Sequence, residues 1–120
     1  MHEPFTVVRG PETGNTAVLR LTGPLDAKTA PGLIEHCAAV HEGGQNLVLN
    51  LEGVTFIASS GIGALLSLAE SFREDERRLG FAAVSPAVES VLALLNLEEF
   101  LTVYTSEDEA LEALEKREAA

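Results

Sequence analysis

Two adjacent serines, Ser59 and Ser60, have the residue type and position in this sequence that best suit covalent or binding chemistry. They follow a β-prone stretch at residues 54–57 and precede apolar residues at helical spacing, which predicts a strand-to-helix turn. The first amides of a helix lack partners within it and carry about half an elementary positive charge. A phosphoryl group on either serine would be held there, and its charge of about −1.5 to −2 would alter a binding surface. The simpler alternative, which spacing alone favours, is that one serine is a helix cap.

Gly61 and Gly63 follow the serines and keep the turn free of bulky side chains, so that a partner could approach closely. Glycines after a strand also occur in loops that bind nucleotide phosphates, so such a loop is an alternative interpretation of this turn. The phosphate-loop pattern needs a lysine after its last glycine, and the dinucleotide pattern needs a third glycine. Neither is present, so we expect no cofactor.

A catalytic role for Ser59 would require a histidine base that is held by a carboxylate. His2 lies near the N-terminus, His36 and His41 fall on the first predicted helix, and no Gly-x-Ser-x-Gly pattern surrounds Ser59. The spacing of five between His36 and His41 points their rings in different directions, which favours two surface histidines over a metal site. We therefore expect neither enzymatic activity nor a bound metal.

The charge balance excludes several classes of partner. Nineteen acidic residues against eight basic ones give a net charge of −11, whereas nucleic acids and anionic membranes require a basic surface. The one tight group of cations, Arg73, Arg77 and Arg78, is interleaved with three acids, and we expect these charges to cancel. The acid-rich stretch from residue 98 onward is interpreted as a solvated helix face.

Localisation follows from what the sequence lacks. Cys37 is a lone cysteine on an apolar stripe, which predicts a small core residue and no internal disulfide. The N-terminal residues show no secretory signal, and no apolar run approaches the roughly 18 residues of a membrane span. We expect a cytoplasmic protein that does not insert into membranes.

Short strands are predicted from β-prone runs at residues 5–8, 16–21, 47–49, 54–57, 81–84 and 101–104. Turn residues at 10–15 make the first two strands a hairpin, and Gly23 with Pro24 is predicted to break the chain after the second. The run at 47–49 does not alternate, which is typical of a strand covered on both faces.

Four helices are predicted from apolar spacing and from start and stop residues. The first runs from an N-cap at Thr29, with Pro31 in its first turn, to Gly43 and Gly44. The second runs from the serine turn to a stop at Gly80, the third opens at Ser85 and Pro86, and the fourth opens with a capping box of Ser106 and Glu109.

The alternation of strands and helices predicts right-handed crossovers between parallel strands, and the opening hairpin adds an antiparallel pair. The chain of 120 residues, 46% of them hydrophobic, suits one compact domain without linkers. The predicted fold is a single α/β domain over residues 1–120, with a mixed sheet of four to five strands and about four flanking helices.

Six blocks of the sequence, in this order, resemble the STAS domain of bacterial anti-sigma factor antagonists. They are LTGPLD at 21–26, TA at 29–30, LVLNL at 47–51, VTFI at 54–57, SSGIG at 59–63 and VSPAV at 84–88. The resemblance covers about residues 5–114, which it implies to be the core of the domain, and its fold agrees with the one predicted above.

The resemblance implies a partner-switching protein that regulates transcription indirectly. The unphosphorylated domain would bind an anti-sigma factor, itself a serine kinase of the histidine-kinase-like ATPase type, and so free the sigma factor. Phosphorylation would dissociate the complex, and a PP2C-type phosphatase would reset it. By position, the phosphorylated residue is Ser59, with Ser60 as its neighbour and helix cap, and Asp26 near it. The implied partner-binding residues are Asp26, Thr29, Ala58, Ser59, Ser60, Gly61 and Ile62.

One position departs from the family pattern, because Ala58 stands where an aspartate usually precedes the first serine. The change removes a negative charge and a hydrogen-bond acceptor. It motivates an alternative hypothesis, in which the domain is a constitutive STAS subunit of a transporter ATPase complex or a stress-signalling assembly and is not phosphorylated.

Overall fold

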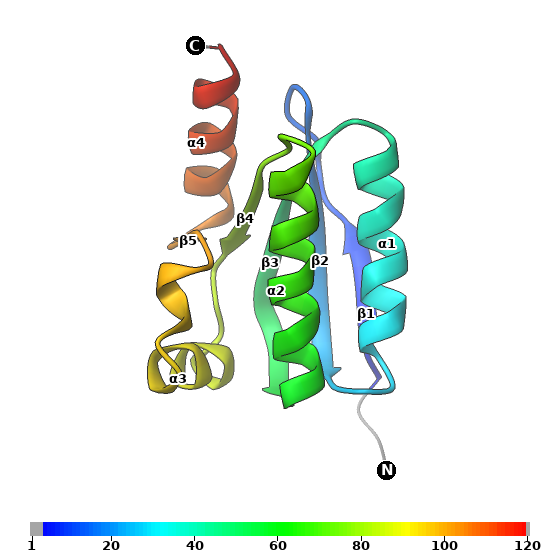
Figure 1. The fold of residues 1–120 in the computed structure, drawn as a ribbon, viewed down its shortest axis with the longest axis vertical. Helices are drawn as coiled ribbons and strands as arrows, with labels where there is room; N and C mark the ends of the chain where they lie inside the picture. The colour runs from blue at the N-terminus through cyan, green and yellow to red at the C-terminus, as the bar shows by residue number, and fades with distance from the viewer. Residues whose placement is uncertain (1–3, 120) are drawn as a thin grey trace.

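A computed structural model of the chain describes residues 4–119, and the side chains of residues 4–115. Five strands form one sheet in the order β1-β2-β3-β4-β5, where β1 is antiparallel to β2 and the other neighbours are parallel (Figure 1). They are β1 Thr6–Arg9, β2 Thr16–Leu25, β3 Asn46–Ile57, β4 Leu79–Ala82 and β5 Val103–Tyr104. The predicted mixed α/β sheet is confirmed, with five strands.

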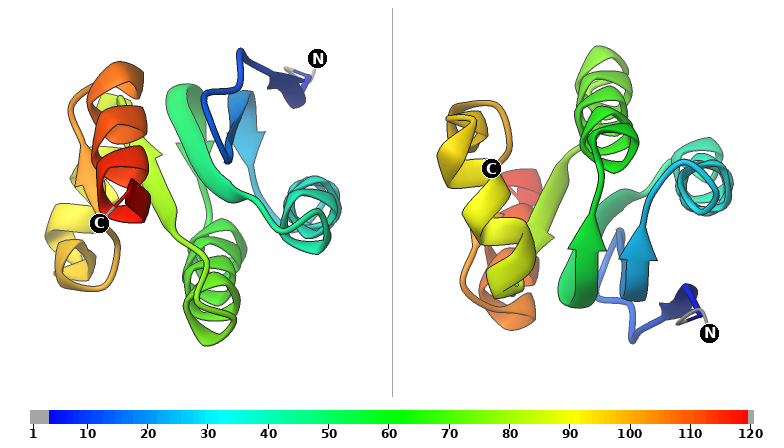
Figure 2. Two further views of the ribbon diagram at one scale, coloured as in Figure 1. Left: turned by 90° about the horizontal axis from the view of Figure 1, so that it is seen from above. Right: turned by 90° about the horizontal axis from the view of Figure 1, so that it is seen from below.

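Helices cover both faces of this sheet (Figure 2). Within the described residues they are α1 Ala30–Glu42, α2 Ser59–Glu74, α3 Pro86–Leu94, a 3-10 turn η1 Leu97–Glu99 and α4 Glu107–Ala119. The first three α-helices pack on one face, and α4 packs on the other. None of the helices in residues 4–119 is long and apolar enough to span a bilayer.

Two apolar clusters make up the core, one on each face, because side chains alternate along each strand. The larger cluster joins β2 and β3 to α1, α2 and α3, and includes Leu21, Leu49 and Phe72. The smaller cluster sets Val18 and Val48 against α4. The central strands are therefore buried on both sides, as the run at residues 47–49 predicts.

The second and third strands are longer than predicted. Gly23 and Pro24 do not end β2, because register shifts at these residues and between Arg20 and Thr22 let it stay paired with β3 as far as Leu25. Gly23 has a φ of 93°, a conformation that side chains disfavour. The predicted pieces at 47–49 and 54–57 are parts of one strand, β3.

The end of α2 also differs from the prediction. The helix ends at Glu74, and Glu76 takes a left-handed conformation with a φ of 57°. The Arg77 amide then donates to the Phe72 carbonyl at 2.7 Å, which is the usual way of closing a helix although glycine usually fills the left-handed position. Gly80, the predicted stop, lies in β4, where a Cβ would be 3.0 Å from the Tyr104 ring.

Other predicted helix ends are confirmed. Gly44, with a φ of 76°, follows α1. The Ser85 hydroxyl accepts the Val88 amide at the start of α3 and donates to the Val54 carbonyl at 2.7 Å. Ser106 caps α4 by accepting the Glu109 amide at 3.1 Å. The Glu109 carboxylate returns to the Thr105 amide at 3.0 Å, one residue before the position that a capping box predicts.

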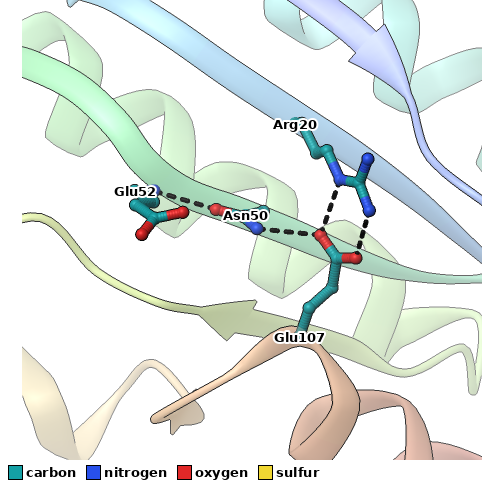
Figure 3. A network of polar contacts seen from close by, with 4 residues as sticks. All are labelled: Arg20, Asn50, Glu52 and Glu107. Carbon is teal, nitrogen blue, oxygen red and sulfur yellow. Dashed lines mark hydrogen bonds and ion pairs between the residues drawn. The ribbon is translucent and has the colours of Figure 1, made fainter.

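A polar network attaches α4 to the sheet (Figure 3). Glu107, in the first turn of α4, accepts two hydrogen bonds from the Arg20 guanidinium at 2.9 and 2.6 Å. It also accepts one from the Asn50 amide at 2.8 Å, and Asn50 Oδ1 accepts the Glu52 amide at 2.9 Å. The hydrogen bond from Arg20 holds the pKa of Glu107 below its ordinary value. Glu107 therefore contacts two strands, unlike the solvated acid expected from the sequence.

Candidate functional site

The candidate site lies where β2 and β3 end, at the same edge of the sheet. The two strands are parallel, and Leu25 pairs with Ile57, so the loops that follow them lie side by side. The Ala58 amide donates to the Leu25 carbonyl at 2.9 Å. This bond joins the loop of Asp26 to the turn of Ser59. Ligands of open α/β sheets bind outside the carboxyl ends of strands in the same way.

The start of α2 corrects one prediction. Ala58 is the N-cap residue, in an extended conformation and with no capping side chain, and Ser59 is the first helical residue. Ser60 is therefore not a helix cap. The reason is that Ala58 is the last residue bonded to β2, so the chain can turn into the helix only after it.

The first turn of α2 presents free hydrogen-bond donors. The Gly61 and Ile62 amides both donate to the Ala58 carbonyl, at 2.9 and 3.0 Å. Within the described part of the chain, the Ser59 and Ser60 amides have no acceptor. No acidic residue lies in this turn to balance the positive end of the helix.

Both serine side chains are exposed, and within residues 4–115 neither hydroxyl makes a hydrogen bond. Ser59 Oγ is thus accessible to a modifying enzyme. A charged group attached to it would lie beside two unused amides and the positive end of α2. The turn has the geometry to hold an anion without unfolding.

The loop after β2 is shaped by Asp26 and Thr29. Asp26 Oδ1 accepts the amides of Lys28 and Thr29 at 3.0 and 3.2 Å. Thr29 Oγ1 donates to the Pro24 carbonyl and accepts the Asp26 amide, both at 2.9 Å. Thr29 occupies the N-cap position of α1 but makes no capping bond, because its hydroxyl is engaged in the loop. The prediction that it caps α1 is wrong in this respect.

Gly61 and Gly63 differ in their surroundings. A Cβ on Gly61 would lie 2.6 Å from the Leu25 carbonyl oxygen, whereas one on Gly63 would meet nothing within 4 Å. Gly61 is buried and allows α2 to pack closely against β2. Of the two glycines, only Gly63 is exposed and could allow the close approach expected for a partner. Ile62 is half-buried and packs against the core.

Phe56 is a residue of this edge that the sequence did not single out. It lies near the end of β3, opposite Pro24, and 55% of it is exposed. An exposed aromatic side chain at this end of β3, three residues before Ser59 in the chain, suits a protein-binding surface. The sequence does not predict the exposure of Phe56, because a short β-prone run such as residues 54–57 indicates a strand without showing which of its side chains face solvent.

Residues considered for other chemistry are accounted for by local contacts. His41 is half-buried, with Nε2 2.8 Å from the Asp75 carboxylate and its ring against Phe72. His36 contacts the Gly32 carbonyl, and His2 lies outside the described residues. Burial raises the pKa of Cys37 to about 12. Within the described residues no group of His, Cys, Asp or Glu could hold a metal.

Comparison with known proteins agrees with this fold. The family model of the STAS domain matches residues 8–110, and the chain belongs to that family. An anti-sigma factor antagonist from Mycobacterium paratuberculosis is 27% identical, with a TM-score of 0.83, and the match covers 96% of this chain and 99% of that one. The Bacillus cell fate determinant SpoIIAA, solved in its phosphorylated form, is 24% identical over 90% and 98% of the two chains, with a TM-score of 0.68.

STAS domains of transporters share the fold. A sulfate transporter family protein from Wolinella succinogenes is 21% identical, with a TM-score of 0.76, and the match covers 88% of this chain and 89% of that one. At this identity the likeness concerns the fold alone. The fold is thus common to anti-sigma factor antagonists and to transporter proteins, and the choice between them depends on the site.

Proposed function

We propose that this protein is a cytoplasmic anti-sigma factor antagonist, acting as one domain, whose binding is switched by phosphorylation of Ser59. The observation that carries the proposal is the exposed Ser59 hydroxyl at the first residue of α2, beside two amides without acceptors in the described chain. The likeness to an antagonist over nearly the whole length of both chains supports the same function.

In this proposal the unphosphorylated domain binds an anti-sigma factor, which is also a serine kinase of the histidine-kinase-like ATPase type. The contact surface is the edge formed by Asp26, Phe56, Ser59 and Ser60. Binding releases a sigma factor, so transcription is regulated without contact between this protein and nucleic acid. The domain is a substrate and a binding partner, and it catalyses no step itself.

The switch is a transfer of one phosphoryl group. A bond forms between Ser59 Oγ and the γ-phosphorus of ATP, the bond from that phosphorus to the bridging oxygen breaks, ADP leaves, and the hydroxyl proton passes to solvent. The Ser59 and Ser60 amides would hold the new anion. The added charge lies next to the Asp26 loop and ends binding through electrostatic repulsion and desolvation. A PP2C-type phosphatase would restore the hydroxyl by hydrolysis.

Ala58 is compatible with this switch. An aspartate at this N-cap position would itself accept from the first amides of α2. Alanine leaves those amides open, and they are then available to a phosphoryl group on Ser59. The departure therefore leaves the amides that would hold the anion in place, although a kinase that reads the aspartate would not recognise this chain.

A second function is favoured by the same residue. If recognition by a kinase requires the missing carboxylate, the domain would be a constitutive subunit of a transporter ATPase complex or a stress-signalling assembly. The shared fold of a sulfate transporter family protein is compatible with this alternative, and the absence of the carboxylate at Ala58 is what favours it.

The deciding experiment is capture of partners from the native cell, followed by reaction of the purified partner with ATP. We expect a histidine-kinase-like ATPase that adds one phosphate to the wild type and to Ser60→Ala, but none to Ser59→Ala. Ser59→Asp should abolish binding. Capture of a transporter ATPase with no phosphorylation would support the second function, and unchanged affinity of Ser59→Asp would refute the switch.

A further inference from the structure

The arginines of residues 73–78, which are interleaved with acids in sequence, lie beside a different cavity from two of those acids. Arg73, Arg77 and Arg78 all line one cavity of about 230 Å³ between α2, β4, β5 and α4. Glu74 and Asp75 line a different cavity, between α1 and α2. Arg73 is paired with Glu70, whereas Arg77 and Arg78 follow the end of α2 and the turn at Glu76, which separates them from Glu74 and Asp75.

The lining of this arginine cavity is unusual for a protein with a net charge of −11. None of the described residues that line it is acidic. Phe100 and Tyr104 supply aromatic surface, and 64% of Phe100 is exposed. A cavity lined by cations and by aromatic rings suits a ligand with an anionic group and an apolar part.

Arg78 is the cation best placed to meet such a ligand. Its backbone is fixed to the start of β3, since its amide donates to Asn46 Oδ1 at 2.8 Å and its carbonyl accepts the Leu47 amide at 2.9 Å. Within residues 4–115 its guanidinium has no hydrogen bond or ion pair. An arginine with a fixed backbone and an unpaired guanidinium beside a cavity is well suited to donate hydrogen bonds to an anion.

The other two arginines contribute less directly. Arg73 contacts Glu70 at 3.0 Å on the surface. Arg77 directs Nη2 toward Gly44, where it would lie 3.4 Å from a Cβ, while its buried Nε has no hydrogen-bond partner in the described chain. Both add positive potential, and Arg77 keeps an unused donor.

The sheet adds a backbone donor. On the side of β4 that faces β5, the Phe81 amide donates to the Thr102 carbonyl at 2.9 Å, and the Ala83 amide donates to the Tyr104 carbonyl at 3.1 Å. By the alternation of a strand, the Leu79 amide faces the same side. However, β5 pairs only with Phe81 and Ala82, so Leu79 lies at an open edge that lines the cavity.

We propose that this arginine cavity binds a small organic anion, with one phosphate or carboxylate group on Arg78 and the Leu79 amide and an apolar part against Phe100 and Tyr104. The site is separate from the Ser59 turn. Arg73 is the fourteenth residue after Ser59 along α2, which is a distance of about 21 Å at the helical rise. The proposal therefore does not depend on the proposed switch.

Titration of the labelled protein with phenyl phosphate, followed by amide NMR shifts, tests the site. We expect saturable shifts at residues 78–81 and 100–104, and none at residues 58–62. Arg78→Gln should weaken binding by roughly tenfold, since a charge-assisted hydrogen bond is lost. Arg9→Gln removes the same charge from an exposed arginine that contacts Glu12, and it should leave binding unchanged.

Two further probes separate the parts of the ligand. Phenol lacks the anion and inorganic phosphate lacks the ring, so each should bind more weakly than phenyl phosphate. Absence of saturable shifts at the cavity, equal binding to Arg78→Gln, or equal binding of either probe would overturn the proposal. Shifts confined to residues 58–62 would also overturn it.

Discussion

Gly61 lies against Leu25 so closely that a Cβ on Gly61 would be 2.6 Å from the Leu25 carbonyl oxygen. The same oxygen accepts the Ala58 amide at 2.9 Å. One carbonyl at the end of β2 thus fixes both the residue before α2 and the third residue within it. The position of Ser59, which lies between them, follows from this contact.

Replacement of Gly61 tests how strongly that contact matters. Gly61→Ala forces the first turn of α2 away from β2, and overpacking of this kind lowers the free energy of unfolding by about 1–3 kcal/mol. Gly63→Ala is the matched control, because its Cβ meets nothing within 4 Å. Alanine is the better helix former by up to about 1 kcal/mol, so this variant should be as stable as the wild type or more stable. Urea unfolding measures both, and an equal loss in the two variants would contradict the contact.

Asp26 has a structural contribution that can be separated from a role in recognition. Asp26→Asn keeps the Oδ1 acceptor for the Lys28 and Thr29 amides, whereas Asp26→Ala removes it. We expect unfolding free energy to fall by about 1 kcal/mol in the alanine variant and to change little in the asparagine variant.

If the anti-sigma partner reads the charge of Asp26, binding by Asp26→Asn should weaken while its stability is retained. Calorimetric titration with the captured partner measures this. Full affinity in Asp26→Asn combined with reduced affinity in Asp26→Ala would assign Asp26 to loop shape alone.

Phe56 is expected to matter for binding and little for folding. Because 55% of it is exposed, Phe56→Ala should change stability by no more than about 0.5 kcal/mol, the usual range for surface positions. An aromatic residue at the centre of an interface contributes enough that affinity should fall more than about tenfold. Val8→Ala is the control, since Val8 is 56% exposed on β1, away from the Ser59 turn. Equal affinities for the two variants would place the binding surface elsewhere.

The Glu107 network predicts a pH dependence. The Arg20 hydrogen bond lowers the pKa of Glu107 in the folded state. Its stabilising contribution is therefore complete above the unfolded pKa of about 4.3, and it is lost as pH falls through the lower folded pKa. Glu107→Gln should be less stable than wild type at neutral pH, and the difference should shrink below about pH 4.

Chemical unfolding at a series of pH values measures that difference. Glu35→Gln is the control, because Glu35 is exposed on α1. It should follow the wild type throughout. A Glu107→Gln difference that stays constant from pH 7 to pH 3 would show that packing, and not charge, attaches α4 to the sheet.

Much of the fold could be predicted because its elements are local patterns. The apolar spacing of α2 and the glycine after α1 act within a few residues, so sequence neighbours are sufficient. The predictions that Gly23 breaks β2 and that Gly80 ends α2 are wrong, because glycine occurs both where an element ends and inside a strand where another segment approaches closely. At both positions a Cβ would meet a segment distant in sequence, Pro4 or Tyr104, and that close approach exists only in the folded chain.

The sequence predicts some features of the candidate site but not others. The exposed serine turn follows from its place between a strand and a helix, and the structure has Ser59 exposed there. The identity of the N-cap residue depends on the hydrogen bond from the Ala58 amide to the Leu25 carbonyl. This bond joins segments that are far apart in sequence, so local sequence patterns do not predict it. The separation of Arg77 and Arg78 from Glu74 and Asp75 likewise depends on the left-handed conformation of Glu76, which residue type alone does not predict for a glutamate.

The bond between the Ala58 amide and the Leu25 carbonyl consists of main-chain atoms alone. Side chains at positions 56 and 58 can therefore be exchanged without breaking the main-chain bond that positions the Ser59 hydroxyl. Homologous domains that keep this main-chain bond can acquire different partners by altering a few surface groups, while the serine hydroxyl stays in one place. In such a lineage, specificity diverges faster than architecture.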